Sequence, residues 1–142
     1  MSGVRRFAPG AAGELGWTGV ERLRYKEEGS APFRDITRQV LFSQPDQQCE
    51  LRYFEIAPGG FSTLERHRHT HAVLILRGHG SVRLGDAELP VAEHDLVTVD
   101  PLTWHQFRAD AGCALGFLCL VSKSRDRPQL PTDEEPAPRE IR

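Results

Sequence analysis

The stretch that decides the fold is GFSTLERHRHTHAVLILRG, residues 60–78, where a histidine-rich segment is followed by an apolar run and a glycine. Within it, His67, His69 and His71 occupy alternate positions. Alternate side chains of a β-strand point to one face, so these imidazoles would form a row with the Glu65 carboxylate. A solvated surface strand is one explanation of such a row. Burial would instead require a partner, and a divalent cation suits neutral imidazoles and a carboxylate. We therefore predict a metal site.

Short β-favouring runs separated by turn residues extend this pattern on both sides. We expect strands near Thr37–Phe42, Glu50–Ile56, Ser62–His67, His71–Arg77, Ser81–Leu84, Asp95–Val99, Trp104–Arg108 and Ala114–Val121. The turns between them are expected at residues 58–60, 78–80, 85–86 and 100–101, which are rich in glycine, proline and aspartate. No stretch of twelve residues has the apolar spacing of an amphipathic helix. The pattern predicts an all-β sandwich or barrel.

The two ends of the chain differ in composition from this central region. Residues 1–36 are rich in glycine with little periodic hydrophobicity, and we interpret them as an N-terminal arm. Residues 37–121 are predicted to form the barrel. Residues 122–142 are rich in proline and charge, and we expect a disordered or loosely draped tail. At 142 residues the chain is long enough for a single domain.

Charge and hydropathy exclude several classes of partner. Lys and Arg number 18 against 20 Asp and Glu, so the basic excess that nucleic acid or anionic lipid would select is missing. No segment has the roughly 18–20 continuous apolar residues of a membrane span, and residues 1–15 contain no apolar run of a signal peptide. We expect a cytoplasmic protein that binds a small molecule, with neither nucleic acid nor membrane as a partner.

Three cysteines are present, and none belongs to a Cys-x-x-Cys pair. An odd number without that spacing argues against a disulfide framework and against a zinc knuckle. Any function of Cys49, Cys113 or Cys119 would therefore be that of a thiol.

Residues 58–121 resemble the cupins, which fold as a double-stranded β-helix, or jelly-roll, barrel. The first cupin motif has a glycine, two histidines separated by one residue, a glutamate, and a glycine that closes it after six more residues. Gly60 opens this motif here and Gly78 closes it. Counting back from Gly78 places His71 at the glutamate position, His67 at the second histidine and Glu65 at the first.

The second cupin motif resembles residues 95–105, with His105 at the last ligand position. The Pro-x-Gly and the closing asparagine of that motif are missing, because Glu93 and Ala109 stand there.

From this alignment and strand parity, we predict that Glu65, His67, His71 and His105 bind one divalent metal ion, with residues 68–70 making a turn. The alternative set takes His69 in place of His71 and leaves Glu65 outside, which a bulge would allow. Mn(II), Fe(II), Zn(II) or Ni(II) would suit these ligands. An open coordination position would separate a catalytic site from a structural one.

Segments 25–33, 51–56, 62–67, 104–107 and 116–119 are similar to the bacterial cupins that act as methylthioxylulose 5-phosphate methylsulfurylases. The resemblance implies manganese, a phosphorylated sugar and transfer of its methylthio group to glutathione as a co-substrate. Cys119 lies in a predicted strand and would be the catalytic nucleophile if it faces the metal, or a buried apolar side chain if it does not. Five basic residues are expected around the barrel, most of them on solvated strand faces and a few at its mouth, where they would hold an anionic group such as a phosphate; they are Lys26, Arg34, Arg38, Arg52 and Arg77.

Two other classes of function remain open on the sequence. The chain could be a cupin dioxygenase or isomerase in which Cys119 is inert, or a non-catalytic cupin that binds a small ligand. Cupins commonly pair through their sheets, so a homodimer is expected.

Overall fold

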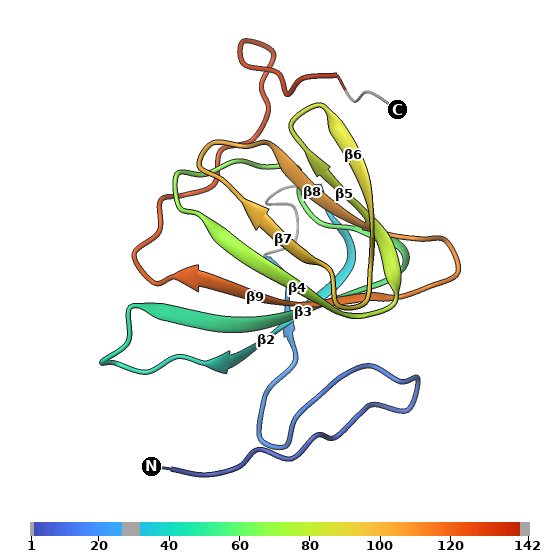
Figure 1. The fold of residues 1–142 in the computed structure, drawn as a ribbon, viewed down its shortest axis with the longest axis vertical. Coiled ribbons are helices and arrows are strands. Elements are labelled where there is room, and N and C mark those ends of the chain that lie inside the picture. The colour runs from blue at the N-terminus through green and yellow to red at the C-terminus, as the bar shows by residue number, and fades with distance from the viewer. Residues whose placement is uncertain (1, 27–31, 140–142) are drawn as a thin grey trace.

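The structure is a computed structural model that describes residues 2–26 and 32–139. Residue 1, residues 27–31 of the expected arm and residues 140–142 of the expected tail lie outside the described ranges. Within those ranges the regular secondary structure consists of β-strands without a helix, which confirms the all-β prediction (Figure 1). None of the described segments forms a helix long and apolar enough to cross a membrane.

The strands in the described ranges are β1 (Leu23–Arg24), β2 (Arg34–Phe42), β3 (Cys49–Phe61), β4 (His71–Arg77), β5 (His79–Leu84), β6 (Ala87–Ala92), β7 (Leu96–Val99), β8 (His105–Ala109) and β9 (Leu115–Ser122). All pairings between them are antiparallel. β1 lies inside the expected arm, and β2 begins at Arg34, three residues before the expected start of the barrel.

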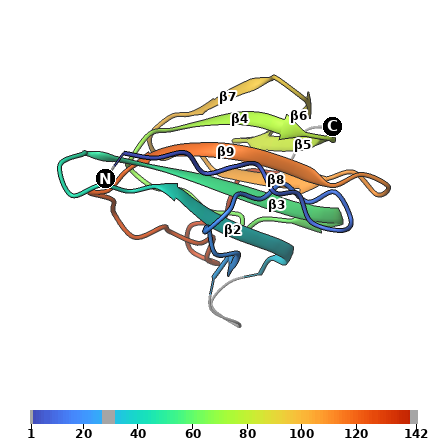
Figure 2. The ribbon, with the colours of Figure 1, turned by 90° about the horizontal axis from the view of Figure 1, so that it is seen from below.

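The long strand β3 joins the two halves of the barrel. Its first part pairs with β2 on one side and β9 on the other, and Phe61 at its end pairs with Arg108 of β8. One half has the strand order β2-β3-β9-β4-β7, and the other contains β6, β5 and β8. Figure 2 shows the strands of the first half, β2, β3, β9, β4 and β7, side by side. Figure 1 shows β5, β6 and β8 across the core from them.

Two of the strand predictions were wrong at this junction. Residues 58–60 were expected to form a turn, but they continue β3, because a register shift against β2 and the positive φ of Gly59 bend the strand toward the second half. Residues 62–67 were expected to form a strand, but they make only isolated bridges at Glu65 and Arg66. Their backbone groups are shared between β8 and the tail, as in the bridge from Arg66 to Gln129. The strand β6 was not predicted, and it contains Pro90.

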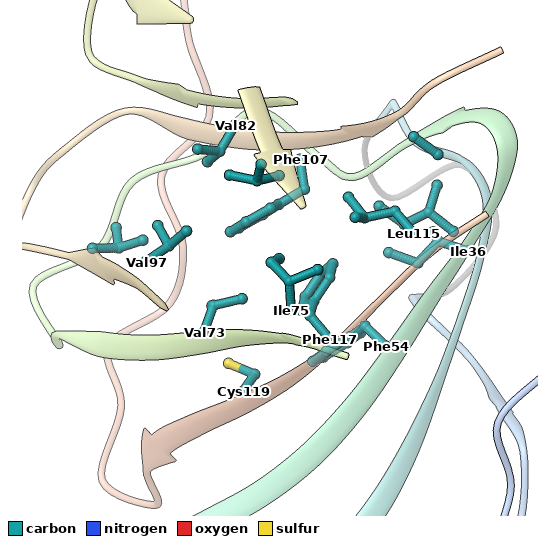
Figure 3. Close-up of a cluster of buried hydrophobic side chains, with 14 of the residues drawn as sticks. Ile36, Phe54, Val73, Ile75, Val82, Val97, Phe107, Leu115, Phe117 and Cys119 are labelled. Atoms are coloured by element: carbon teal, nitrogen blue, oxygen red, sulfur yellow. The ribbon is translucent and has the colours of Figure 1, made fainter. Parts of the chain in front are cut away.

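The core between the two halves is built around three aromatic rings. Phe117 of β9 stacks on Phe54 of β3 at 5.6 Å between centroids, and on Phe107 of β8 at 4.7 Å. Figure 3 shows Cys119 at the edge of this cluster, beside Val73, its partner in the ladder between β9 and β4. Along the inward face of β9, the aromatic ring of Phe117 is therefore followed by the thiol of Cys119.

The turn between β4 and β5 requires a glycine. Gly78 has φ +71°, and a Cβ added there would overlap the backbone carbonyl of Ala114. This close approach keeps the hairpin against the loop before β9.

The arm and the tail both contact the barrel. Trp17 packs edge-on against Tyr53 at 5.4 Å between ring centroids. Beyond β9, the described part of the tail has no strand, but Asp126 and Gln129 bond to residues 66–69. The tail therefore forms part of the wall around the histidine-rich segment.

Candidate active site

A cavity of about 230 Å³ lies between the two halves of the barrel, and the histidine-rich segment forms one side of it. Among the described residues, the ionisable side chains that line it are imidazoles, four cations, two carboxylates and a thiol. They are His67, His69, His71, His105, Lys26, Arg38, Arg52, Arg125, Glu65, Asp126 and Cys119, together with Tyr25, Ser62 and Thr63. Phe54, Phe107 and Phe117 of the core lie on its apolar side.

Three of the imidazoles converge in this cavity. His67 lies just before a bend, His71 begins β4 and His105 begins β8. One ring nitrogen from each lies within 4.8 Å of the other two. The structure thus brings together three of the four predicted ligands.

The hydrogen bonds of the rings assign which nitrogen faces the cavity. His67 Nδ1 lies 2.7 Å from the carbonyl oxygen of His69, and His105 Nδ1 lies 2.9 Å from that of Thr103. A carbonyl can only accept, so each Nδ1 carries the proton and each Nε2 keeps a free lone pair. Such outer hydrogen bonds are the usual means of orienting a metal-binding histidine.

The environment keeps these imidazoles neutral. Burial, followed by repulsion from the neighbouring rings, lowers the pKa of His67 to about 4 and that of His71 to about 2. Burial also lowers the pKa of His105. Neutral rings have lone pairs available for a cation at physiological pH.

The donor set fits a divalent metal ion. His71 Nε2 is buried and has no hydrogen-bond partner in the structure, which is costly unless a ligand takes its lone pair. Three imidazole nitrogens suit first-row divalent metals and leave coordination positions open. His67, His71 and His105 are therefore the residues that would hold such an ion.

Glu65, the fourth predicted ligand, lies outside this group of three nitrogens. It is buried in the cavity wall, where its backbone pairs with His105 in both directions. Its carboxylate accepts a hydrogen bond from Lys26 Nζ at 2.5 Å. The carboxylate therefore already has a cationic partner from the N-terminal arm.

His69, the alternative ligand, also lies outside the group. Its ring stacks on His67 at 3.6 Å between centroids, and its Nδ1 lies 3.0 Å from Asp126 Oδ1. The same carboxylate accepts the backbone N–H groups of Arg68 and His69. Asp126 thus holds the bend and, through His69, the ring of His67.

The Cys119 thiol lies between the histidines and the arginines. Its Sγ is 3.5 Å from His71 Nδ1 and 3.9 Å from Arg52 Nη2, and Arg52 is its direct neighbour in the ladder between β3 and β9. Burial raises the pKa of this thiol, and Arg52 acts in the opposite direction. Cys49 and Cys113 do not line the cavity.

Sequence reasoning missed the contribution of the tail to this site. Arg125 and Asp126 line the cavity, although residues 122–142 were expected to be disordered or loosely draped. The segment Lys123–Pro128 contains charged residues but no apolar residue that would indicate docking. No signal in the sequence distinguishes it from the rest of the tail.

The comparisons with known proteins agree with this architecture. The family model of the cupin domain matches residues 52–121. A curated relative from Rhodospirillum rubrum, named 1-methylthio-D-xylulose 5-phosphate methylsulfurylase, is 60% identical over 119 residues, which are 84% of this chain and 76% of that protein. The chain therefore belongs to the cupin family.

Solved structures with substantial sequence identity have the same fold. A cupin 2 conserved barrel domain protein from Rhodopseudomonas palustris is 53% identical with a TM-score of 0.81, covering 92% of this chain and 88% of that one. A cupin-2 domain from Rhodospirillum rubrum is 59% identical with a TM-score of 0.79, covering 84% and 80%. A cupin 2 domain-containing protein from Halorhodospira halophila is 38% identical with a TM-score of 0.67, covering 94% and 85%.

Proposed function

We propose that this chain is a metal-dependent cupin enzyme that transfers the methylthio group of 1-methylthio-D-xylulose 5-phosphate to glutathione, leaving 1-deoxy-D-xylulose 5-phosphate. The observation that carries the proposal is the position of the Cys119 thiol, 3.5 Å from His71 within the three-histidine cavity. The name of the 60% identical relative from Rhodospirillum rubrum supports the same reaction.

The reaction balances without an outside oxidant or reductant. Cys119 attacks the sulfur of the substrate, the bond between that sulfur and C1 breaks, and its electron pair stays on C1. The proton lost by the thiol balances the proton gained by C1. Glutathione then releases the methylthio group from Cys119 by thiol–disulfide exchange. The thiol sulfur is oxidised to a mixed disulfide and C1 is reduced.

A divalent cation, which we propose to be manganese, would supply Lewis-acid polarisation of the ketose carbonyl when bound by His67, His71 and His105. If Nε2 of His71 held the ion, Nδ1 would carry the ring proton and would donate to Cys119 Sγ, which lies 3.5 Å away. Arg52 Nη2 is a second donor toward the same sulfur. These two donors favour the thiolate and so offset the effect of burial on the thiol.

The test is conversion of synthetic 1-methylthio-D-xylulose 5-phosphate by the manganese-loaded protein in the presence of glutathione. We expect 1-deoxy-D-xylulose 5-phosphate and the methyl disulfide of glutathione in equal amounts by mass spectrometry. Cys119→Ser should remove turnover and Cys113→Ser should keep it, because Cys113 lies outside the cavity.

Two other outcomes would overturn the role of Cys119 or the reaction as a whole. Turnover that survives in Cys119→Ser would show that glutathione attacks the substrate directly. Absence of both products with the wild-type protein, under conditions where the metal is bound, would refute the reaction itself.

A further inference from the structure

Three arginines gather on one side of the cavity, each from a different part of the chain. Arg38 comes from β2, Arg52 from β3 and Arg125 from the segment after β9. Because Arg38 pairs with Phe54, it lies diagonally across from Arg52 on the same face of the sheet. On the inward face of β3, the charged side chain of Arg52 is therefore followed by the aromatic ring of Phe54.

Within the part of the chain that the structure describes, these guanidinium groups have little negative charge to balance them. Among the described residues, Glu50 is the acidic side chain near Arg52 and Arg125. Its Oε1 lies 3.8 Å from Arg52 Nε and from Arg125 Nη1, which is longer than a hydrogen bond. The other carboxylates of the cavity are engaged elsewhere, Glu65 with Lys26 and Asp126 with the bend at residues 68–69. Among the described residues, four cations and two carboxylates line the cavity, a net charge of +2 that becomes +1 when Glu50 is counted.

Arg52 shows that this cluster is incomplete. Its side chain is 16% exposed, and its Nε is buried without a hydrogen-bond partner. A buried N–H without an acceptor is destabilising, so an acceptor is expected at this position in the working protein. The guanidinium lies over the ring of Phe54 at 5.0 Å, and this contact leaves the buried Nε–H able to donate in the plane of the group.

We propose that Arg38, Arg52 and Arg125 form a subsite for a phosphate monoester dianion, which holds the phosphate end of the substrate. The inference rests on the proposed function, because that substrate carries its phosphate at C5 and its methylthio group at C1. Planar guanidinium forks match phosphate oxygens and form charge-assisted hydrogen bonds with them. A dianion would also offset the excess of positive charge among the described residues of the cavity.

The subsite would fix the orientation of the substrate within the cavity. Arg52 Nη2 lies 3.9 Å from Cys119 Sγ, and that sulfur lies 3.5 Å from His71. A phosphate on the arginines therefore directs the rest of the five-carbon chain past the thiol toward the three histidines. The arginines would act as binding and positioning residues, and the sulfur chemistry would stay with Cys119.

The first test measures binding of inorganic phosphate and of D-xylulose 5-phosphate to the manganese-loaded protein by isothermal titration calorimetry. Arg38→Gln and Arg125→Gln should each weaken binding of both probes about 10-fold or more, as expected for loss of a charge-assisted hydrogen bond. The matched control is Arg34→Gln. Arg34 lies on β2 like Arg38, but it pairs with Asp35 and does not line the cavity. Arg34→Gln should bind inorganic phosphate and D-xylulose 5-phosphate with the affinity of the wild type.

A second variant separates the arginines from the histidine site. His71→Gln should keep phosphate binding, because the anion is held by the arginines. Loss of phosphate binding in His71→Gln, with wild-type affinity in both arginine variants, would place the anion at the histidines and overturn the subsite. Thermal unfolding without ligand checks that each variant is folded.

The kinetics distinguish failure of the subsite from failure of the reaction. In the arginine variants KM for 1-methylthio-D-xylulose 5-phosphate should rise at least 10-fold, with a smaller change in kcat. Turnover with an unchanged KM would refute the subsite and leave the reaction standing. Arginine-dependent phosphate binding in a wild-type protein that makes no product would uphold the subsite and refute the reaction.

Discussion

Acidification from pH 7 to 5 should destabilise the metal-free protein, because three imidazoles are buried together. His67 and His71 have pKa values of about 4 and about 2 in the folded state, against 6.5 as the ordinary value. Below pH 6.5 the unfolded chain binds protons that the folded chain excludes. The free energy of unfolding therefore falls as the pH falls from 6.5 toward the folded pKa values.

The size of the effect follows from these pKa values. Each histidine lowers the free energy of unfolding by up to about 1.4 kcal/mol per pH unit, and by about 1.6 kcal/mol in all from pH 6.5 to 5, because the unfolded ring is only half protonated at pH 6.5. His67 and His71 together account for about 3 kcal/mol, a large part of the roughly 5–15 kcal/mol that stabilises a typical domain. Glu55 acts in the opposite direction, because burial raises its pKa.

The assay is urea unfolding of chelator-treated protein at pH 7, 6 and 5. His71→Gln removes one titrating ring, so its stability should fall by about 2 kcal/mol less than that of the wild type over this range. The control is His94→Gln, since His94 is exposed and lies outside the cavity. A wild-type stability that stays constant from pH 7 to 5, or equal changes in the two variants, would contradict the burial of neutral histidines described above.

Three further predictions concern the supports of the site. Gly78→Ala should lower the free energy of unfolding by about 2 kcal/mol or more, because it combines a positive φ with a backbone overlap. Urea unfolding should show a far smaller change for Gly112→Ala, where an added Cβ meets no atom within 4 Å. Asp126→Ala should weaken metal binding about 10-fold or more, because the bend and the His69 ring lose their acceptor; competition with a chelating dye would measure this, and unchanged affinity would contradict it. Deletion of residues 133–142 should change the melting temperature little, since the ion pair of Glu135 with Arg66 is exposed and such pairs contribute under about 1 kcal/mol. A large drop would show that this segment is needed for stability.

The all-β fold and the histidine positions could be predicted because they depend on local patterns. Turn residues recur every eight to twelve positions, and strand parity places alternate side chains on one face. The same parity, with the need for a turn at residues 68–70, favoured His71 over His69. In the structure His67, His71 and His105 are the residues whose nitrogens converge.

The strand errors arose where pairing is not local. Residues 58–60 contain the residue types of a turn, yet they continue β3, because the barrel needs one strand that passes between its two halves. Residues 62–67 have alternating polarity, but their backbone is divided between β8 and the tail. Local propensity cannot reveal such partners, because tertiary contacts decide them.

By itself the sequence determined the β architecture, the cupin-type motifs and the imidazoles available for a metal, since these follow from residue type and short-range spacing. Only the tertiary structure decided the charge environment of the cavity. Lys26 reaches Glu65 across 39 positions of the chain, and Arg125 comes from a tail without any docking signal. These contacts depend on the register between distant segments, and no periodicity within either segment encodes that register.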